Sequence, residues 1–239
     1  MSQTPTASLI DRSKPRDYGA ALAAASIWGG MYVVSDVVLE TIPPFTLLLF
    51  RLLLGIAAWG LVLLARRTPV AWRRMGPVLF TGLVGYGISL GFQFVGTRLS
   101  TAANGALITS ATPAFVALFG VWILGEHLSR RKTGALLLAS LGVVLVIDPR
   151  SADLSADTFL GNLALLGAGI TWGLYSVLVR RDSTRGFGMA ELTFVLLIGG
   201  LPVAVPLAYL EGARASAVGP GLVAISWTPG LVLGVLYLG

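Results

Sequence analysis

The chain alternates long apolar runs with short polar connections. An apolar run of about 20 residues is long enough to cross the hydrocarbon core of a bilayer as a helix. This pattern predicts seven complete membrane helices and the start of an eighth near residue 229. The complete helices are expected over residues 19–39, 45–65, 75–96, 101–124, 133–147, 159–179 and 189–210. Polar residues 1–18 are expected to form a solvated N-terminal tail, and 148–158 an extracytoplasmic linker.

Two of these helices carry similar sequences. Residues 25–32 read ASIWGGMY in the first span, and residues 169–175 read GITWGLY in the sixth. The sixth span lies five crossings after the first, so the second copy crosses in the opposite direction, as in inverted-repeat transporters. We therefore expect an all-α polytopic membrane protein built as an inverted repeat of five-helix units. Residues 19–147 would form the first repeat, and 159–239 a partial second repeat, truncated within helix eight.

Composition and charge support this interpretation. Hydrophobic residues make up 55% of the chain and charged residues only 12%, which favours a protein immersed in lipid over a soluble domain. The net charge of +6 comes from short basic clusters between apolar runs, a distribution that argues against nucleic-acid binding. Thirteen Lys and Arg residues lie before the first span or after an even-numbered span, and three lie in the other loops. Because cytoplasmic loops are rich in Lys and Arg, we expect a cytoplasmic N-terminus in the cytoplasmic (inner) membrane.

Few side chains in this sequence suit catalysis or metal binding. The chain has no cysteine, which excludes disulfides, thiolate metal sites and cysteine nucleophiles, and His127 is its single histidine. We therefore expect no enzyme activity, no metal site and no cofactor.

Four short motifs occur in a characteristic order along the first half of the chain. They are WG at 28–29, PP at 43–44 followed by LLFRLLL at 48–54, STAAN at 100–104 leading to TPAF at 112–115, and LGEHLS at 124–129. Together they make the chain resemble the drug/metabolite transporter (DMT) superfamily, in its EamA-type branch. This resemblance implies ten helices in two inverted repeats, and transport of metabolites, amino acids or drugs, often outward.

The candidate substrate site consists of aromatic side chains in the two similar helices. Trp28 and Tyr32 are four residues apart and share one face of the first helix, as Trp172 and Tyr175 do in the sixth. We expect these four residues to line one cavity near the bilayer midplane, although ordinary helix packing would give the same spacing. The polar candidates for orienting a substrate are Gln93, Asn104, Thr109 and Thr112, with hydrogen bonding between helices as the alternative role for the two amides.

The fourth helix contains a proline and ends at a glycine. Pro113 removes one backbone hydrogen bond and predicts a kink, and Thr109, Ser110 and Thr112 can satisfy the freed carbonyls. A static kink and a moving hinge both remain open. Gly125 and Glu126 follow this helix as a second predicted hinge, with Glu126 expected to pair with Arg130 or Arg131.

Asp36 and Arg51 are charged residues within the predicted spans. Both are expected within about two helical turns of the outer loop on adjacent helices, so we predict an ion pair between them. A proton-coupling role for Asp36 is the alternative, and Arg51 would oppose it by favouring the ionised carboxylate.

These features favour a transporter over a membrane scaffold. We expect a secondary transporter that moves small metabolites, amino acids or drug-like compounds by alternating access, in the direction of export. Its expected partners are the substrate and the lipid bilayer, and both a monomer and a homodimer are open. The alternative is a membrane scaffold or assembly subunit that transports nothing. A central cavity lined by Trp28 and Trp172 would favour transport, and a fully packed centre would favour the scaffold.

Overall fold

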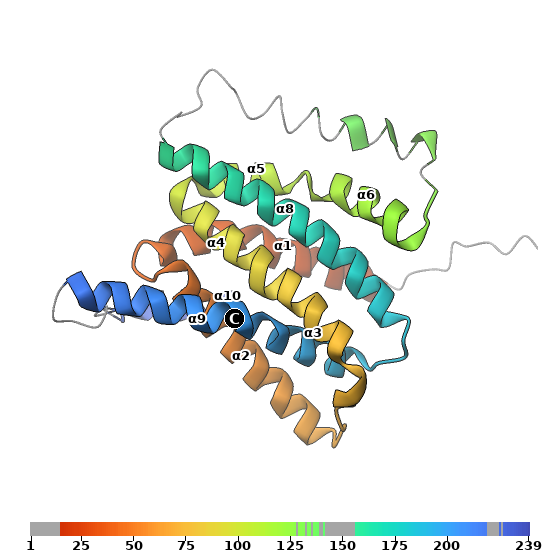
Figure 1. Ribbon diagram of the computed structural model, residues 1–239, viewed down its shortest axis with the longest axis horizontal. Helices are drawn as coiled ribbons and strands as arrows, with labels where there is room; N and C mark the ends of the chain where they lie inside the picture. Colours follow the sequence, from red (N-terminus) through yellow and green to blue (C-terminus); the bar gives the residue numbers. More distant parts are fainter. Residues whose placement is uncertain are drawn as a thin grey trace, which may run out of the picture.

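The computed structural model describes residues 15–127, 129–131, 133–134, 136–138, 141, 156–218, 225 and 227–239. The regular structure in these ranges is helical, as predicted (Figure 1). The elements are α1 (Pro15–Leu39), α2 (Pro44–Ala65), η1 (Trp72–Arg74), α3 (Gly76–Gly82), η2 (Leu83–Ser89), α4 (Leu90–Leu99), α5 (Ala102–Thr109), α6 (Thr112–Leu124), α8 (Ala156–Ser183), α9 (Met189–Val218) and α10 (Pro229–Leu238).

Five helices of the described chain are long and apolar enough to cross a membrane. They cover Pro44–Ala65, Gly76–Leu99, Ala102–Leu124, Asp157–Ser183 and Met189–Arg214. Two shorter apolar stretches also match predicted spans. Ser26–Leu39, within α1, matches the first predicted span, and Pro229–Leu238, which is α10, matches the start of the eighth. The predicted fifth span, residues 133–147, lies largely outside the described residues. The chain therefore folds as an all-α polytopic membrane protein.

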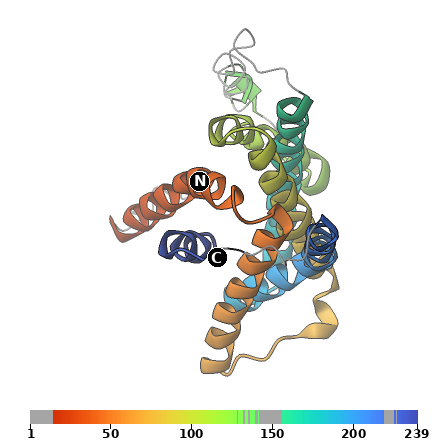
Figure 2. The same ribbon diagram turned by 90° about the vertical axis from the view of Figure 1, so that its left-hand side faces the viewer.

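Several packing contacts join the early helices to the late ones, and three of them involve helix pairs that an exchange of repeats would interchange. The third membrane helix, formed by α3, η2 and α4 in succession, packs along α8, and α2 packs along α9. The third contact is between α1 and α10, which lie side by side (Figure 2). Counted as membrane helices, these contacts are three with six, two with seven and one with eight. Exchanging helices one to three with helices six to eight maps these three contacts onto themselves, and the inverted orientation of the repeats stays a prediction.

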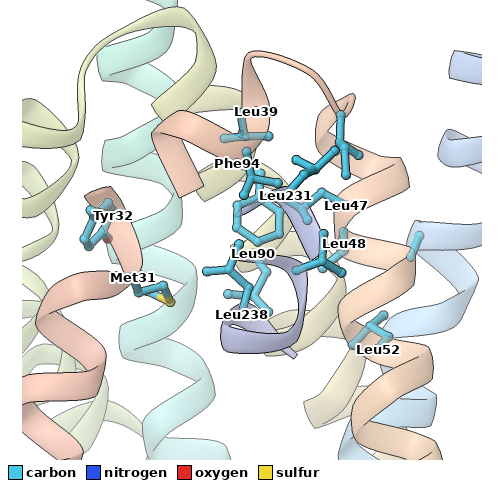
Figure 3. Close-up of a cluster of buried hydrophobic side chains, with 14 of the residues drawn as sticks. Met31, Tyr32, Leu39, Leu47, Leu48, Leu52, Leu90, Phe94, Leu231 and Leu238 are labelled. Atoms are coloured by element: carbon cyan, nitrogen blue, oxygen red, sulfur yellow. The ribbon is translucent and has the colours of Figure 1, made fainter. Parts of the chain in front are cut away.

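A cluster of buried side chains fills the space between α1, α2, α4 and α10 (Figure 3). Its members include Leu39, Leu47, Leu90, Phe94 and Leu231, each almost inaccessible to solvent. The cluster joins α10 to the N-terminal helices. It therefore holds the last described helix of the predicted second repeat against the first repeat.

Two carboxylates of α9 accept hydrogen bonds from the start of α2 and from the loop that follows it. Near the start of α9, Glu191 accepts a hydrogen bond of 2.7 Å from the backbone N–H of Ala71, in the loop after α2. Near its end, Glu211 accepts from the backbone N–H groups of Phe45 and Thr46, at 3.0 and 2.8 Å, and from the Thr46 hydroxyl. The N-cap residue of α2 is Pro43, which supplies no side-chain cap. Glu211 thus satisfies N–H groups that the first turn of a helix leaves without partners.

Glu211→Gln should destabilise the protein. The substitution replaces one acceptor oxygen with an amide nitrogen that cannot accept from the α2 backbone, and it removes the charge that favours a helix N-terminus. We expect a loss of about 1 kcal/mol, measured as a lower midpoint of thermal unfolding in detergent. Glu40→Gln, at an exposed carboxylate just before α2, is the control and should leave the midpoint unchanged. An unchanged midpoint in Glu211→Gln would contradict the capping role.

Gly82→Ala should also destabilise the fold, because α3 and α9 approach each other closely. A Cβ atom at Gly82 would overlap the backbone carbonyl of Leu196, which cannot move as a flexible side chain can. Overpacking of this kind costs about 1–3 kcal/mol, again read from thermal unfolding in detergent. At Gly60, inside α2, an added Cβ would only touch Phe194 Cε2 at 3.4 Å. Gly60→Ala should therefore be tolerated, and equal effects of the two substitutions would show that close packing is not the cause.

Candidate functional site

A cavity of about 880 Å³ lies between α1, α4, α8 and the helix-four segments α5 and α6. Six of the eight predicted substrate-site residues line it. They are Trp28, Tyr32, Gln93, Thr109, Thr112 and Trp172. The proposed hinge residues Pro113 and Glu126 line it as well, and Asn104 and Tyr175 do not. A volume in this range is typical of small-molecule sites in proteins.

The two similar sequence stretches meet at this cavity. The rings of Trp28 and Trp172 pack edge to face with centroids 5.5 Å apart. Tyr175 is buried behind Trp172, with its ring centroid 4.7 Å from the tryptophan, so it supports the cavity wall without forming the surface. Edge-to-face and tilted arrangements of this kind are the favoured geometries of aromatic pairs.

A fourth aromatic side chain, Tyr86, completes the group of Trp28, Trp172 and Tyr175. Its ring centroid lies 6.4 Å from that of Trp172 and 5.6 Å from that of Tyr175. Tyr86 belongs to the π-helical segment η2, and such wider turns occur frequently at functional sites. Gly85 comes next to it in sequence, and any side chain there would overlap the Tyr175 ring. Tyr86 is not among the site residues predicted from the sequence, although its position between Gly85 and Gly87 is a visible signal of close packing.

Helix four is interrupted where its proline predicts a kink. It consists of α5, which ends at Thr109, and α6, which begins at Thr112 with Pro113 in its first turn. The proline leaves the Thr109 carbonyl without its helical partner, and the Thr112 hydroxyl donates to this carbonyl at 2.5 Å. The hydroxyls of Thr109 and Ser110 bond back to the carbonyls of Gly105 and Leu107, both at 2.6 Å. The Thr112 hydroxyl thus compensates the interruption, as the sequence predicts, whereas the Leu107 carbonyl also accepts the backbone N–H of Ser110.

Two polar candidates at the cavity contact α1. The hydroxyl groups of Tyr32 and Thr109 lie 2.6 Å apart and form a hydrogen bond between α1 and α5. Gln93 Nε2 lies 3.8 Å from the sulfur of Met31. A hydrogen bond to a thioether is weak, which leaves this amide able to take a better partner.

Asn104 makes contacts near the end of α8 that lies away from the cavity. Its amide Nδ2 donates to the Ser100 hydroxyl at 3.0 Å, and Ser100 donates to Asn162 Oδ1 at 2.7 Å. Of the two roles open to Asn104, the structure favours hydrogen bonding between helices over contact with a substrate.

The structure does not form the predicted ion pair between Asp36 and Arg51. Arg51 Nη1 instead lies 3.4 Å from the sulfur of Met31, and the guanidinium sits 6.0 Å from the centroid of the Phe94 ring. Asp36 lies on the exposed face of α1. Counting residues gives the depth of each charge, but it does not give the rotation of its helix, and α1 turns Asp36 away from Arg51.

Glu126 also has a different partner from the predicted one. Its carboxylate Oε1 lies 2.5 Å from Nη1 of Arg180, at the end of α8, and not beside Arg130 or Arg131. The preceding Gly125 adopts a left-handed conformation with φ of +66° and caps α6. This turn directs Glu126 back towards α8, which explains the choice of partner. The hinge role of Gly125 and Glu126 stays a prediction.

Residues 17–148, more than half of the chain, match the model of the EamA-like transporter family. The chain belongs to this family. It is therefore an EamA-type permease of the drug/metabolite transporter superfamily and an integral multi-pass membrane protein.

Several curated relatives extend over most of the chain. The transporter YcxC of Bacillus subtilis (strain 168) is 25% identical, covering 97% of this chain and 74% of its own length. A "Probable amino-acid metabolite efflux pump" of Salmonella typhimurium is 26% identical over 93% of this chain and 73% of its own length. The "Pseudopaline exporter CntI" of Pseudomonas aeruginosa (strain PAO1) is 30% identical, covering 70% of this chain and 57% of its own length. Names of this kind point to a role other than catalysis.

A solved crystal structure shares the fold. It superposes with a TM-score of 0.64 at 22% identity, covering 91% of this chain and 72% of the other.

The chain offers a direct test of the meeting between α1 and α8. Because it contains no cysteine, Trp28→Cys combined with Trp172→Cys gives exactly one thiol pair and no background. A short bifunctional thiol reagent applied to native membranes should link the two positions, measured by mass spectrometry of the digested protein. Val33→Cys combined with Trp172→Cys is the control, since Val33 is exposed on α1 and does not line the cavity. Linking of the control alone would contradict the arrangement.

Proposed function

We propose that this protein is a secondary transporter that exports small molecules through the cavity between α1, α4, α6 and α8. The observation that carries the proposal is the cavity of about 880 Å³ with Trp28 and Trp172 in its wall. A scaffold protein has no need of such a space, because close packing of the helices would stabilise it better. Membership of the EamA-like family and the names of two relatives, an efflux pump and an exporter, support transport outward.

The chemistry of the cavity wall suggests which substrates fit. Aromatic faces of Trp28, Tyr32 and Trp172 would hold an apolar or aromatic group. Gln93 and the hydroxyl groups of Thr109 and Thr112 would orient a polar end. This combination suits amino acids and drug-like amphiphiles. One relative is named for amino-acid metabolites, which supports the same class.

Alternating access would come from rocking of the two repeats around this fixed site. Two contacts support such a motion, the contact of helix one with helix eight and the contact of helix three with helix six. They are equivalent under exchange of the repeats, so each would take the place of the other when the transporter changes from one open side to the opposite one. The interruption at Pro113 and the turn at Gly125 would act as hinges. The clustering of basic residues supports an N-terminus on the cytoplasmic side of the cytoplasmic membrane.

Trp28→Ala and Trp172→Ala should each impair transport in the full-length protein. Loss of one aromatic wall should weaken substrate affinity about tenfold, since a buried aromatic contact contributes about 1–3 kcal/mol. Uptake and efflux of candidate amino acids and amphiphiles in liposomes measure the effect. Trp122→Ala is the matched control, because Trp122 is 72% exposed on α6 and lies outside the cavity. Parental rate and affinity in both cavity variants would show that the tryptophans serve packing and that the site lies elsewhere.

A further inference from the structure

One ion pair stands at the edge of the cavity, where α6 and α8 end. Glu126 lines the cavity and pairs with Arg180, which does not line it. The pair joins a helix of the first half of the chain to a helix of the second. The inference drawn from it rests on the proposed transport function, because it concerns selection of the substrate.

The backbone conformation at the end of α6 sets the direction of the Glu126 side chain. Gly125 takes the left-handed conformation that glycine adopts without strain, and the N–H of Glu126 bonds to the carbonyl of Gly120 at 3.2 Å. Gly120 has no side chain, and a Cβ atom there would lie 3.1 Å from Glu126 Oε2. The Glu126 side chain therefore lies back over α6, on the side facing α8, and does not extend into the loop that follows.

Glu126 is the single carboxylate among the described residues that line the cavity. The remaining lining side chains are aliphatic, aromatic, hydroxyl or amide groups, together with the imidazole of His127 beside Glu126. A cationic group that entered the cavity would thus meet one acidic partner. Because an ammonium in apolar surroundings is costly without a counter-charge, this carboxylate would favour cationic substrates over neutral ones.

Arg180 is a partner that can be displaced. Its side chain is 66% exposed and that of Glu126 is 33% exposed, so water reaches the pair and weakens it. Along α8, Arg180 lies eight residues after Trp172, which places it about 12 Å further along the helix axis. A substrate whose apolar end rests on the tryptophans could therefore bring a cationic end to Glu126.

We propose that Glu126 selects substrates that carry an ammonium or similar cationic group, and that Arg180 competes with them for its carboxylate. Arg180 occupies Glu126 while the cavity is empty and swings into solvent when a cation binds. Glu126 then raises the affinity for a cationic substrate, and Arg180 lowers it. A purely structural latch between α6 and α8 would instead make loss of either partner harmful in the same way.

A pair of probes that differ in one group tests this proposal. 4-Phenylbutylamine carries an ammonium at neutral pH, and 4-phenyl-1-butanol has the same length without a charge. Binding of each labelled compound to the purified full chain in nanodiscs is measured by equilibrium dialysis, with empty nanodiscs as the blank. The variants are Glu126→Gln, Arg180→Gln and their combination. Arg66→Gln is the charge-matched control, since Arg66 is exposed at the end of α2.

The unmodified protein should bind the amine more tightly than the alcohol. Glu126→Gln should lower the affinity for the amine about tenfold, the effect expected for losing one charge-assisted contact. Arg180→Gln should raise this affinity about threefold, the size expected for removing a partly exposed competing pair. The double variant should behave as Glu126→Gln alone, and Arg66→Gln as the unmodified protein. Affinity for the alcohol should not change in any variant.

Three outcomes would overturn the proposal. If both single variants weaken amine binding, the pair is a structural latch. If the alcohol binds as tightly as the amine, Glu126 does not select charge, while the proposed cavity keeps its function. If neither compound binds, both the selection and the proposed use of the cavity for amphiphilic amines are wrong.

Discussion

The hydrocarbon core of a bilayer offers no hydrogen-bond partners to a polypeptide backbone. Each N–H and C=O group at that depth must therefore be satisfied within the protein. Continuous helices meet this requirement by themselves, and most of the described chain is built from them. Wherever a helix is interrupted, a side chain has to replace the missing partner. The Thr112 hydroxyl does so for the Thr109 carbonyl in helix four, and Glu211 does so for the first turn of α2.

The same interruptions create the cavity. Two continuous helices would pack along their whole length, but helix four bends between α5 and α6, and helix three widens at η2. The bend exposes Thr109, Thr112 and Pro113 to the cavity, and the wider turn brings Tyr86 against Trp172. The irregular backbone of helix four is tolerated here because the Thr112 hydroxyl replaces the missing backbone donor. Structural irregularity and the candidate binding site thus have one physical origin.

The carboxylates of α9 bear on how such a protein could move. In an inverted repeat, the second and seventh helices exchange with each other, so their contact lies on the axis that relates the repeats. Glu211 ties the start of α2 to α9, and Glu191 ties the loop after α2 to α9. Rocking of the repeats about this axis need not break the contact between α2 and α9. The contacts that would change are those at the periphery, including the exposed pair between Glu126 and Arg180.

The sequence by itself determined the class of the protein and the positions of most of the described helices. Runs of apolar residues fix which segments enter the bilayer, and Pro113 with its neighbouring hydroxyls fixes where helix four is interrupted, because both effects act within one segment. The tertiary structure decided which residues meet. A membrane helix that is apolar on all sides carries little information about its rotation, so the sequence could not show that Asp36 turns away from Arg51. It likewise could not show that Glu126 reaches Arg180, because this partner lies on another helix. Such pairings depend on how helices pack against one another, and packing is a property of the assembled bundle.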